Sequence, residues 1–105
     1  MKEPENSNEM FFVRIYLTEG EKRLKRVLAL LHDEHRVQGV TVFRGITGFG
    51  RSGAFHSSSL IDISMDLPLA VEFFDDKEKV MEIISLLKEM IEPEHIVYWP
   101  AFLPV

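Results

Sequence analysis

The order of two kinds of hydrophobic pattern constrains the fold of this chain more than any other feature. Short apolar runs rich in β-branched and aromatic residues have the character of strands. Two longer stretches carry apolar residues at helical spacing and separate the first run from the second and the third from the fourth. The strands are expected at 10–17, 40–46, 67–74 and 96–99, and the helices at 21–36 and from Asp75 or Asp76 to Pro93. This β-α-β-β-α-β order predicts an α+β domain of the ferredoxin-like kind, with a four-stranded antiparallel sheet and two helices on one face.

Each predicted helix has one apolar stripe. In the first helix the stripe consists of Leu24, Val27, Leu28, Leu31 and His35. In the second it consists of Val80, Ile83, Ile84, Leu87 and Ile91. An aspartate at the start of the second helix can accept hydrogen bonds from the first free backbone N–H groups, so we interpret Asp75 or Asp76 as the helix cap.

Apolar residues occur on both faces of the first and third predicted strands. Phe12 and Tyr16 alternate with Val13 and Ile15, and the third strand shows the same mixture. Two helices can cover only one face of a sheet, so the other face needs a partner. The apolar C-terminal residues would also be unfavourable in water. Homo-oligomerisation is the simplest explanation.

Composition limits the classes of function that need to be considered. A chain of 105 residues, 46% hydrophobic and without cysteine, fits one domain over 1–105 with no disulfide or thiolate chemistry. The net charge of −5 argues against nucleic-acid binding. We expect residues 1–9 to be a frayed tail, and they lack the apolar segment of a signal peptide. No run is long enough to span a bilayer, so a cytoplasmic protein without membrane insertion is expected.

Four of the six glycines lie between residues 45 and 53, with Arg44 and Arg51 beside them. Glycine tolerates positive φ, so consecutive N–H groups could turn toward one anion, and guanidinium groups could add charge-assisted bonds. The alternative is a merely mobile connection. No helix pattern follows, which excludes a P-loop and a dinucleotide fingerprint. The segment 47–62 shows no periodicity and is long for so small a domain, which is typical of a functional or disordered loop.

Histidines and acidic residues suggest further sites. His32 and His35 are three residues apart on a helix and could bind a metal, although His35 also fits the apolar stripe. Asp75 and Asp76 could hold magnesium, but helix capping explains them without a ligand. No residue pattern indicates a catalytic centre, so we expect no enzymatic activity.

The residues Gly39-Val40-Thr41-Val42, followed by Gly48-Phe49-Gly50-Arg51, resemble the second strand and T-loop entry of the PII signalling proteins. The longer pattern GVTVFRGITGFG, His56 and the segment DLPLAVEFFD are similar to a PII-like group, the domain of unknown function one-ninety. The resemblance covers about residues 10–100. It implies a PII-like trimer that binds ATP, ADP or AMP between subunits, with 47–62 as an effector arm. No tyrosine lies between residues 47 and 66, so the uridylylation known in PII proteins has no acceptor there.

The resemblance also assigns roles to individual residues. The nucleotide site it implies consists of Thr41, Phe43, Arg44, Gly45, Gly48, Phe49, Gly50, Arg51 and His56. Magnesium is a further candidate ligand, and the expected partners are other copies of the chain and an unknown target protein such as a membrane transporter or an enzyme. Three alternatives remain open. One is a small nucleotide-hydrolysing enzyme in the same cleft, with His56 or an acidic residue as base. Another is a metal-binding ferredoxin-like trimer that uses His32, His35 or His95, and the third is a purely structural oligomer.

Overall fold

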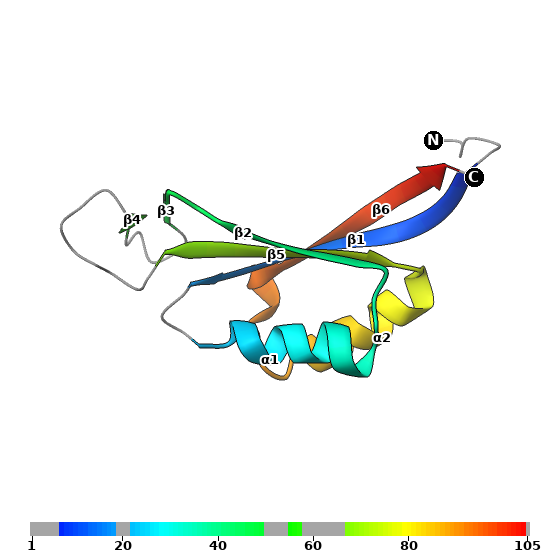
Figure 1. Cartoon of the computed structure of the whole chain (residues 1–105), viewed down its shortest axis with the longest axis horizontal. Helices are drawn as coiled ribbons and strands as arrows, with labels where there is room; N and C mark the ends of the chain where they lie inside the picture. The colour runs from blue at the N-terminus through cyan, green and yellow to red at the C-terminus, as the bar shows by residue number, and fades with distance from the viewer. Residues whose placement is uncertain (1–6, 19–21, 50–54, 58–66, 105) are drawn as a thin grey trace.

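A four-stranded antiparallel sheet forms the centre of the molecule in the computed structural model, which describes residues 7–18, 22–49, 55–57 and 67–104 (Figure 1). The strand order is β2-β5-β1-β6, so β2 and β6 are the edges. The four strands are β1 (Ser7–Thr18), β2 (Gly39–Arg44), β5 (Pro68–Asp75) and β6 (Ile96–Pro104). The ferredoxin-like arrangement predicted from the sequence is confirmed.

The two helices lie on the same side of this sheet (Figure 1). Helix α1 (Leu24–Ala29) continues as a π-helical segment (Leu30–Glu34), and α2 (Lys77–Leu87) leads through a 3-10 turn (Pro93–His95) into β6. The first helix was expected from residue 21, but Lys22 has a φ of 59°, which is incompatible with a right-handed helix. At its other end Arg36 has a φ of 46° and reverses the chain toward β2.

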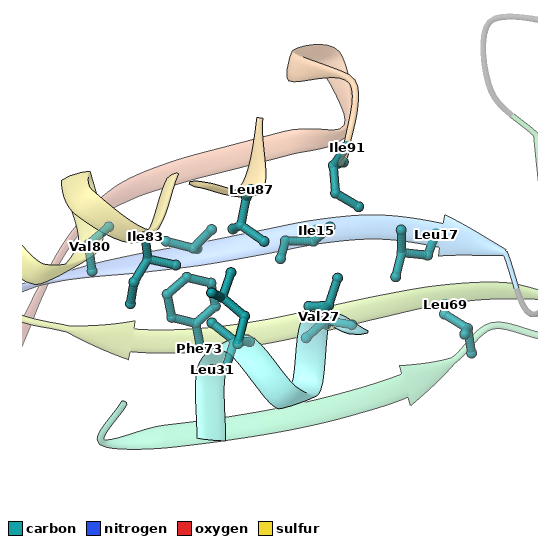
Figure 2. Packing of buried hydrophobic residues seen from close by; sticks show 13 residues of the cluster. Ile15, Leu17, Val27, Leu31, Leu69, Phe73, Val80, Ile83, Leu87 and Ile91 are labelled. Atoms are coloured by element: carbon teal, nitrogen blue, oxygen red, sulfur yellow. The ribbon is translucent and has the colours of Figure 1, made fainter. Parts of the chain in front are cut away.

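The core fills the space between the helices and the sheet (Figure 2). Alternate residues of β1 and β5 point toward the helices, so Val13, Ile15, Val71 and Phe73 are fully buried. The helices contribute Val27, Leu30, Leu31, Val80, Ile83 and Leu87 to the same cluster. Leu30 is buried where Leu28 was expected, and Val27, Leu30 and Leu31 have the i, i+3, i+4 spacing of one helix face.

Strands β1 and β6 extend beyond their expected limits. The frayed tail was predicted to reach residue 9, but β1 begins at Ser7, and β6 continues past Trp99 to Pro104. The two extensions pair with each other, from Ser7 opposite Pro104 to Met10 opposite Ala101. Prolines are tolerated here because β6 is an edge strand.

Candidate functional site

The predicted glycine segment starts where the edge strand β2 ends. Arg44 is the last residue of β2 and pairs with Leu69 at the start of β5. The next residue, Gly45, donates its backbone N–H to the carbonyl oxygen of Pro68 at 2.7 Å. The beginning of the glycine segment is therefore fastened to the beginning of β5.

Packing accounts for the first of these glycines. A Cβ atom on Gly45 would lie 2.7 Å from Cγ of Pro68, closer than real Cβ atoms approach a neighbour. On Gly48 the nearest such contact would be an ordinary 3.5 Å. Neither glycine has a φ in the left-handed region, so the positive-φ nest expected from the sequence is not adopted at these two positions. Gly50 and Arg51 lie outside the described residues.

A small hairpin follows within the segment that the sequence left without structure. Strand β3 (Thr47–Phe49) pairs with β4 (Phe55–Ser57), and both lie beyond the end of β2 (Figure 1). The register places Gly48 directly opposite His56. Two predicted site residues that are eight positions apart are therefore cross-strand neighbours in their backbones.

Thr41 and Phe43 lie on the sheet face that the helices leave open. They pair with Glu72 and Ala70 of β5, which alternate with its buried residues. Phe43 is 51% exposed, and Phe49 in the hairpin is 66% exposed. Both of these large apolar side chains are open to a ligand or another subunit that could cover them.

Not all of the predicted site residues share that face. Arg44 is exposed, but its partner Leu69 is a helix-facing core residue. Side chains alternate between the two faces along a strand, so the side chain of Arg44 leaves the backbone on the face opposite to Thr41 and Phe43. The structure thus brings Thr41 and Phe43 together on one face, and Gly45, Gly48 and the backbone of His56 together at its end.

Asp75 and Asp76 have structural partners. Asp76 is the N-cap of α2 and accepts a hydrogen bond from the backbone N–H of Lys79 at 3.0 Å, which confirms the capping interpretation for that residue. Asp75 is only 2% exposed and accepts hydrogen bonds from the backbone N–H groups of Gln38 and Asp76. Its other neighbour is the Lys79 ammonium, 3.4 Å away.

Their position also separates these aspartates from the glycine segment. Asp75 ends β5, whereas Gly45 contacts Pro68 at the start of the same strand. Seven steps along a strand span roughly 23 Å. A magnesium ion held by Asp75 and Asp76 would be far from a nucleotide at Gly48 of the same subunit.

The histidines of the metal hypothesis lie on two elements, with His32 and His35 at the end of the first helix and His95 in the 3-10 turn before β6. His32 is exposed, and its Nδ1 lies 2.7 Å from Oδ1 of Asp33. Within the described ranges, no three histidine, aspartate or glutamate side chains are grouped so that they could hold a metal ion. A hollow of about 650 Å³ is lined by His32, Asp33, Arg36 and Val37, none of which belongs to the predicted nucleotide site. None of the helices described is long and apolar enough to cross a bilayer.

Arg23 clamps the connection between α2 and β6. Its Nη1 donates to the carbonyl oxygen of Met90 at 2.8 Å and to Oε2 of Glu92 at 3.1 Å. The backbone N–H of Glu92 and then the Arg23 guanidinium lower the pKa of the Glu92 carboxyl below its ordinary value. The clamp ties the start of α1 to the residues that lead into β6.

Sequence reasoning missed a polar network on the open face of the sheet. Arg14 of β1 lies opposite Glu72 of β5, and the two form an ion pair through both Nε and Nη2 of the arginine. The guanidinium also lies over the Trp99 ring, 5.5 Å from its centroid. Hydrogen bonds with Tyr16 and then Glu72 raise the pKa of Arg14 further above its ordinary value. The sequence shows the two opposite charges, but only the register of β1 and β5 shows that they face each other.

Comparison with known proteins places the chain in a family. The model of the DUF190 family, described as an uncharacterized ACR, matches residues 10–102. A UPF0166 protein of Aquifex aeolicus is 30% identical over 86 residues, which cover 82% of this chain and 88% of that protein.

Solved structures show a similar fold. CPII of Thiomonas intermedia K12, a nitrogen regulatory PII-like protein bound to ADP, AMP and bicarbonate, has a TM-score of 0.62 at 20% identity, covering 94% of this chain and 90% of its own. A PII-like protein of Thermus thermophilus has a TM-score of 0.63 at 17% identity, covering 95% and 92%. The chain thus has a PII-like fold, and it belongs to the DUF190 family.

Proposed function

We propose that this chain is a cytoplasmic, non-enzymatic regulator of the PII-like kind. It assembles as a trimer, binds an adenine nucleotide in the clefts between subunits, and signals to a protein target through the segment 47–62. The solved PII-like neighbour that holds ADP and AMP supports an adenine nucleotide as the ligand class. The target is a protein that recognises the segment in only one of its states.

The observation that carries the proposal is the hairpin at the end of the edge strand. Gly48 of β3 lies opposite His56 of β4, next to the point where Gly45 is fastened to Pro68. A ligand that contacts Gly48 is therefore one strand spacing from the backbone of β4, which lies within the segment 47–62. Occupancy of the site can change the order of that segment directly.

The exposed side chains suit the two parts of a nucleotide. Phe43 and Phe49 are 51% and 66% exposed and offer apolar, aromatic surface for a base. Arg44 and Arg51 flank the glycines in the sequence and can supply charge-assisted hydrogen bonds to phosphate oxygens. Because β2 is an edge strand, a neighbouring subunit can close the other side of the cleft.

A nucleotide can act as a signal only if it binds the two states of the segment with different affinity. A ligand that binds both states equally shifts nothing, however tightly it binds. We therefore assign the signalling role to ordering of the segment 47–62 when the nucleotide binds. Contact with the nucleotide would stabilise or extend the hairpin within this segment.

The first experiment is a thermal-shift panel with ATP, ADP, AMP, cyclic AMP and adenosine, each with and without magnesium. A ligand at a hundred times its dissociation constant adds about 2.7 kcal/mol to the unfolding free energy. In a domain of this size that raises Tm by roughly 10 °C or more. If no adenine compound shifts Tm, the proposed ligand class is wrong.

The second experiment assigns the phosphate contact. Arg51→Ala is expected to weaken ADP binding by at least about tenfold, the loss of one charge-assisted hydrogen bond, and to leave adenosine binding almost unchanged. Arg26→Ala removes an exposed arginine from α1 and is the matched control. Equal weakening of ADP and adenosine by Arg51→Ala would show that Arg51 does not bind phosphate.

A further inference from the structure

Strand β2 carries two of the predicted site residues, yet burial of its side chains does little to fix its register. It is an edge strand of the sheet and pairs with β5. None of its six residues is buried, and even the helix-facing Val40 and Val42 are 36% and 37% exposed. Register is strongly specified where one face of a strand is buried, and a slip of one residue exchanges the two faces. Such a slip would turn Thr41 and Phe43 away from the open face.

Contacts at the two ends of β2 supply what burial does not. Beyond its last residue, the backbone N–H of Gly45 is fastened to the start of β5. At its first residue, Gly39 lies opposite Phe74, and a Cβ atom on this glycine would lie 2.6 Å from the phenylalanine ring. One residue earlier, the backbone N–H of Gln38 donates to a carboxylate oxygen of Asp75 at 3.1 Å. The position of β2 along β5 is therefore fixed at its entry and at its exit.

The carboxylate of Asp75 is buried, and both of its oxygens have partners. The Asp75 side chain is only 3% exposed, and its Oδ1 accepts the backbone N–H of Asp76 at 2.8 Å. Its Oδ2 accepts the Gln38 N–H and lies 3.4 Å from Nζ of Lys79. The same ammonium group donates to the carbonyl oxygen of Arg36 at 3.3 Å. Because Arg36 is the positive-φ residue that reverses the chain, these contacts hold the entry of β2 against the start of α2 (Figure 1).

This anchor and the proposed nucleotide site lie at opposite ends of β2. Phe43 is five residues beyond Gln38, which is roughly 17 Å along a strand. Asp75 can therefore affect a nucleotide at the glycine segment of the same subunit only through the placement of the strand. A register that breaks the contact with Gln38 would leave a buried carboxylate short of a partner, which is unfavourable.

We propose that Asp75 is a positioning residue for the nucleotide site. Its buried carboxylate, held by Lys79, fixes the entry of β2 and so keeps Thr41 and Phe43 on the face where the nucleotide binds. This inference rests on the proposed function and adds to it a residue outside the site. When the anchor is lost, only a fraction of the molecules holds β2 in the competent register. The apparent dissociation constant of every ligand then rises by the reciprocal of that fraction.

The test compares ADP and adenosine binding to full-length wild type and Asp75→Asn. Both dissociation constants are expected to rise by the same factor of about ten, which corresponds to a competent fraction of about one tenth. Loss of a phosphate contact, as proposed for Arg51, would weaken ADP alone. Without nucleotide, the amides of 39–44 are expected to exchange hydrogen about tenfold faster in Asp75→Asn, whereas those of 13–15 in β1 keep their rates.

Three further variants separate positioning from a general loss of stability. Lys79→Met changes a side chain that is 33% exposed, and it should weaken ADP and adenosine equally. Combined with Asp75→Asn, it should weaken them no further, because the two residues act as one unit. Ile83→Val removes a methyl group from the buried side of α2 and Lys25→Met changes an exposed lysine of α1. Ile83→Val should lower Tm, and both controls should leave the dissociation constants and the exchange of 39–44 within about twofold of wild type.

The outcomes distinguish this inference from the proposed function. Asp75→Asn that binds both ligands like wild type would overturn the inference and leave the proposed function standing. Weakened binding of ADP but not of adenosine would also overturn it, because that pattern indicates a phosphate contact. The same holds if Ile83→Val weakens both ligands as much as Asp75→Asn. If wild type binds no adenine compound, the proposed function is wrong, and unchanged exchange of 39–44 in Asp75→Asn would show that the carboxylate does not fix β2 either.

Discussion

A pair of glycine substitutions tests whether packing or a ligand explains the glycine segment. Gly45→Ala places a methyl group 2.7 Å from Cγ of Pro68 and 3.4 Å from its carbonyl oxygen, which already accepts the Gly45 N–H. The Pro68 ring or the start of β5 must move. Gly48→Ala places its methyl group at 3.5 Å from the same ring, which is ordinary contact.

The two substitutions are expected to change the free energy of unfolding differently. Overpacking at residue 45 is unfavourable by about 1–3 kcal/mol, and the lower entropy of an unfolded chain with alanine returns about 0.4–1 kcal/mol. Gly45→Ala should therefore lower the unfolding free energy by roughly 1–2 kcal/mol and Tm by roughly 5–15 °C. Gly48→Ala should leave both unchanged or slightly higher.

The assay is urea unfolding followed by circular dichroism at one fixed protein concentration without nucleotide, since association and ligands shift apparent stability. A Gly45→Ala variant as stable as wild type would refute the packing argument. So would a Gly48→Ala variant destabilised as much as Gly45→Ala. ADP titration of the same two proteins then shows whether Gly48, which packing does not require to be glycine, contributes to ADP binding.

Three further predictions concern the charged residues. Asp75→Asn should lower the unfolding free energy by about 1–3 kcal/mol, because one of two backbone N–H donors then faces an amide nitrogen; chemical denaturation that shows no loss would contradict this. Asp76→Ala should lose about 1 kcal/mol and Asp76→Ser much less, since serine also caps helices; equal losses would rule out capping as the cause. The pKa of Glu92 is lowered on folding, so its contribution is complete above its unfolded value near 4.5 and disappears as pH falls through the lower folded value. The stability difference between wild type and Glu92→Gln should therefore shrink below about pH 4.5, and a difference that stays constant from about pH 6 to 3 would refute the pairing with Arg23.

Local patterns were sufficient to predict the main elements. Helical spacing and short apolar runs identified both helices, all four strands of the sheet and most of the core, because burial on one face imposes those periods. The sequence could not reveal the pairing of Ser7–Glu9 with 102–104, since a polar segment and a short apolar one that ends in proline form a strand pair only through their contact with each other. The three-residue strands of the hairpin are likewise too short to show alternation.

The candidate site was predictable in part for similar reasons. The glycine cluster begins directly after β2, although the strand was expected to continue to 46 and ends at Arg44. Only the structure shows that packing against Pro68 requires glycine at position 45. Arg14 lies between apolar residues of β1, and that pattern indicated only a strand with two apolar faces. Its partner, Glu72, is 58 residues away in the sequence. Opposite charges at matching positions can be recognised only once the register of β1 and β5 is known.

Hydrogen exchange of the hairpin with and without ADP tests the central claim most directly. We predict that saturating ADP slows exchange of the backbone amides in 47–49 and 55–57, because the nucleotide contacts Gly48 and stabilises its pairing with His56. The amides at the other end of the sheet, 11–13 of β1 and 73–75 of β5, should change much less. Bound ADP that leaves exchange in 47–57 unchanged would contradict the claim that this segment reports occupancy of the site.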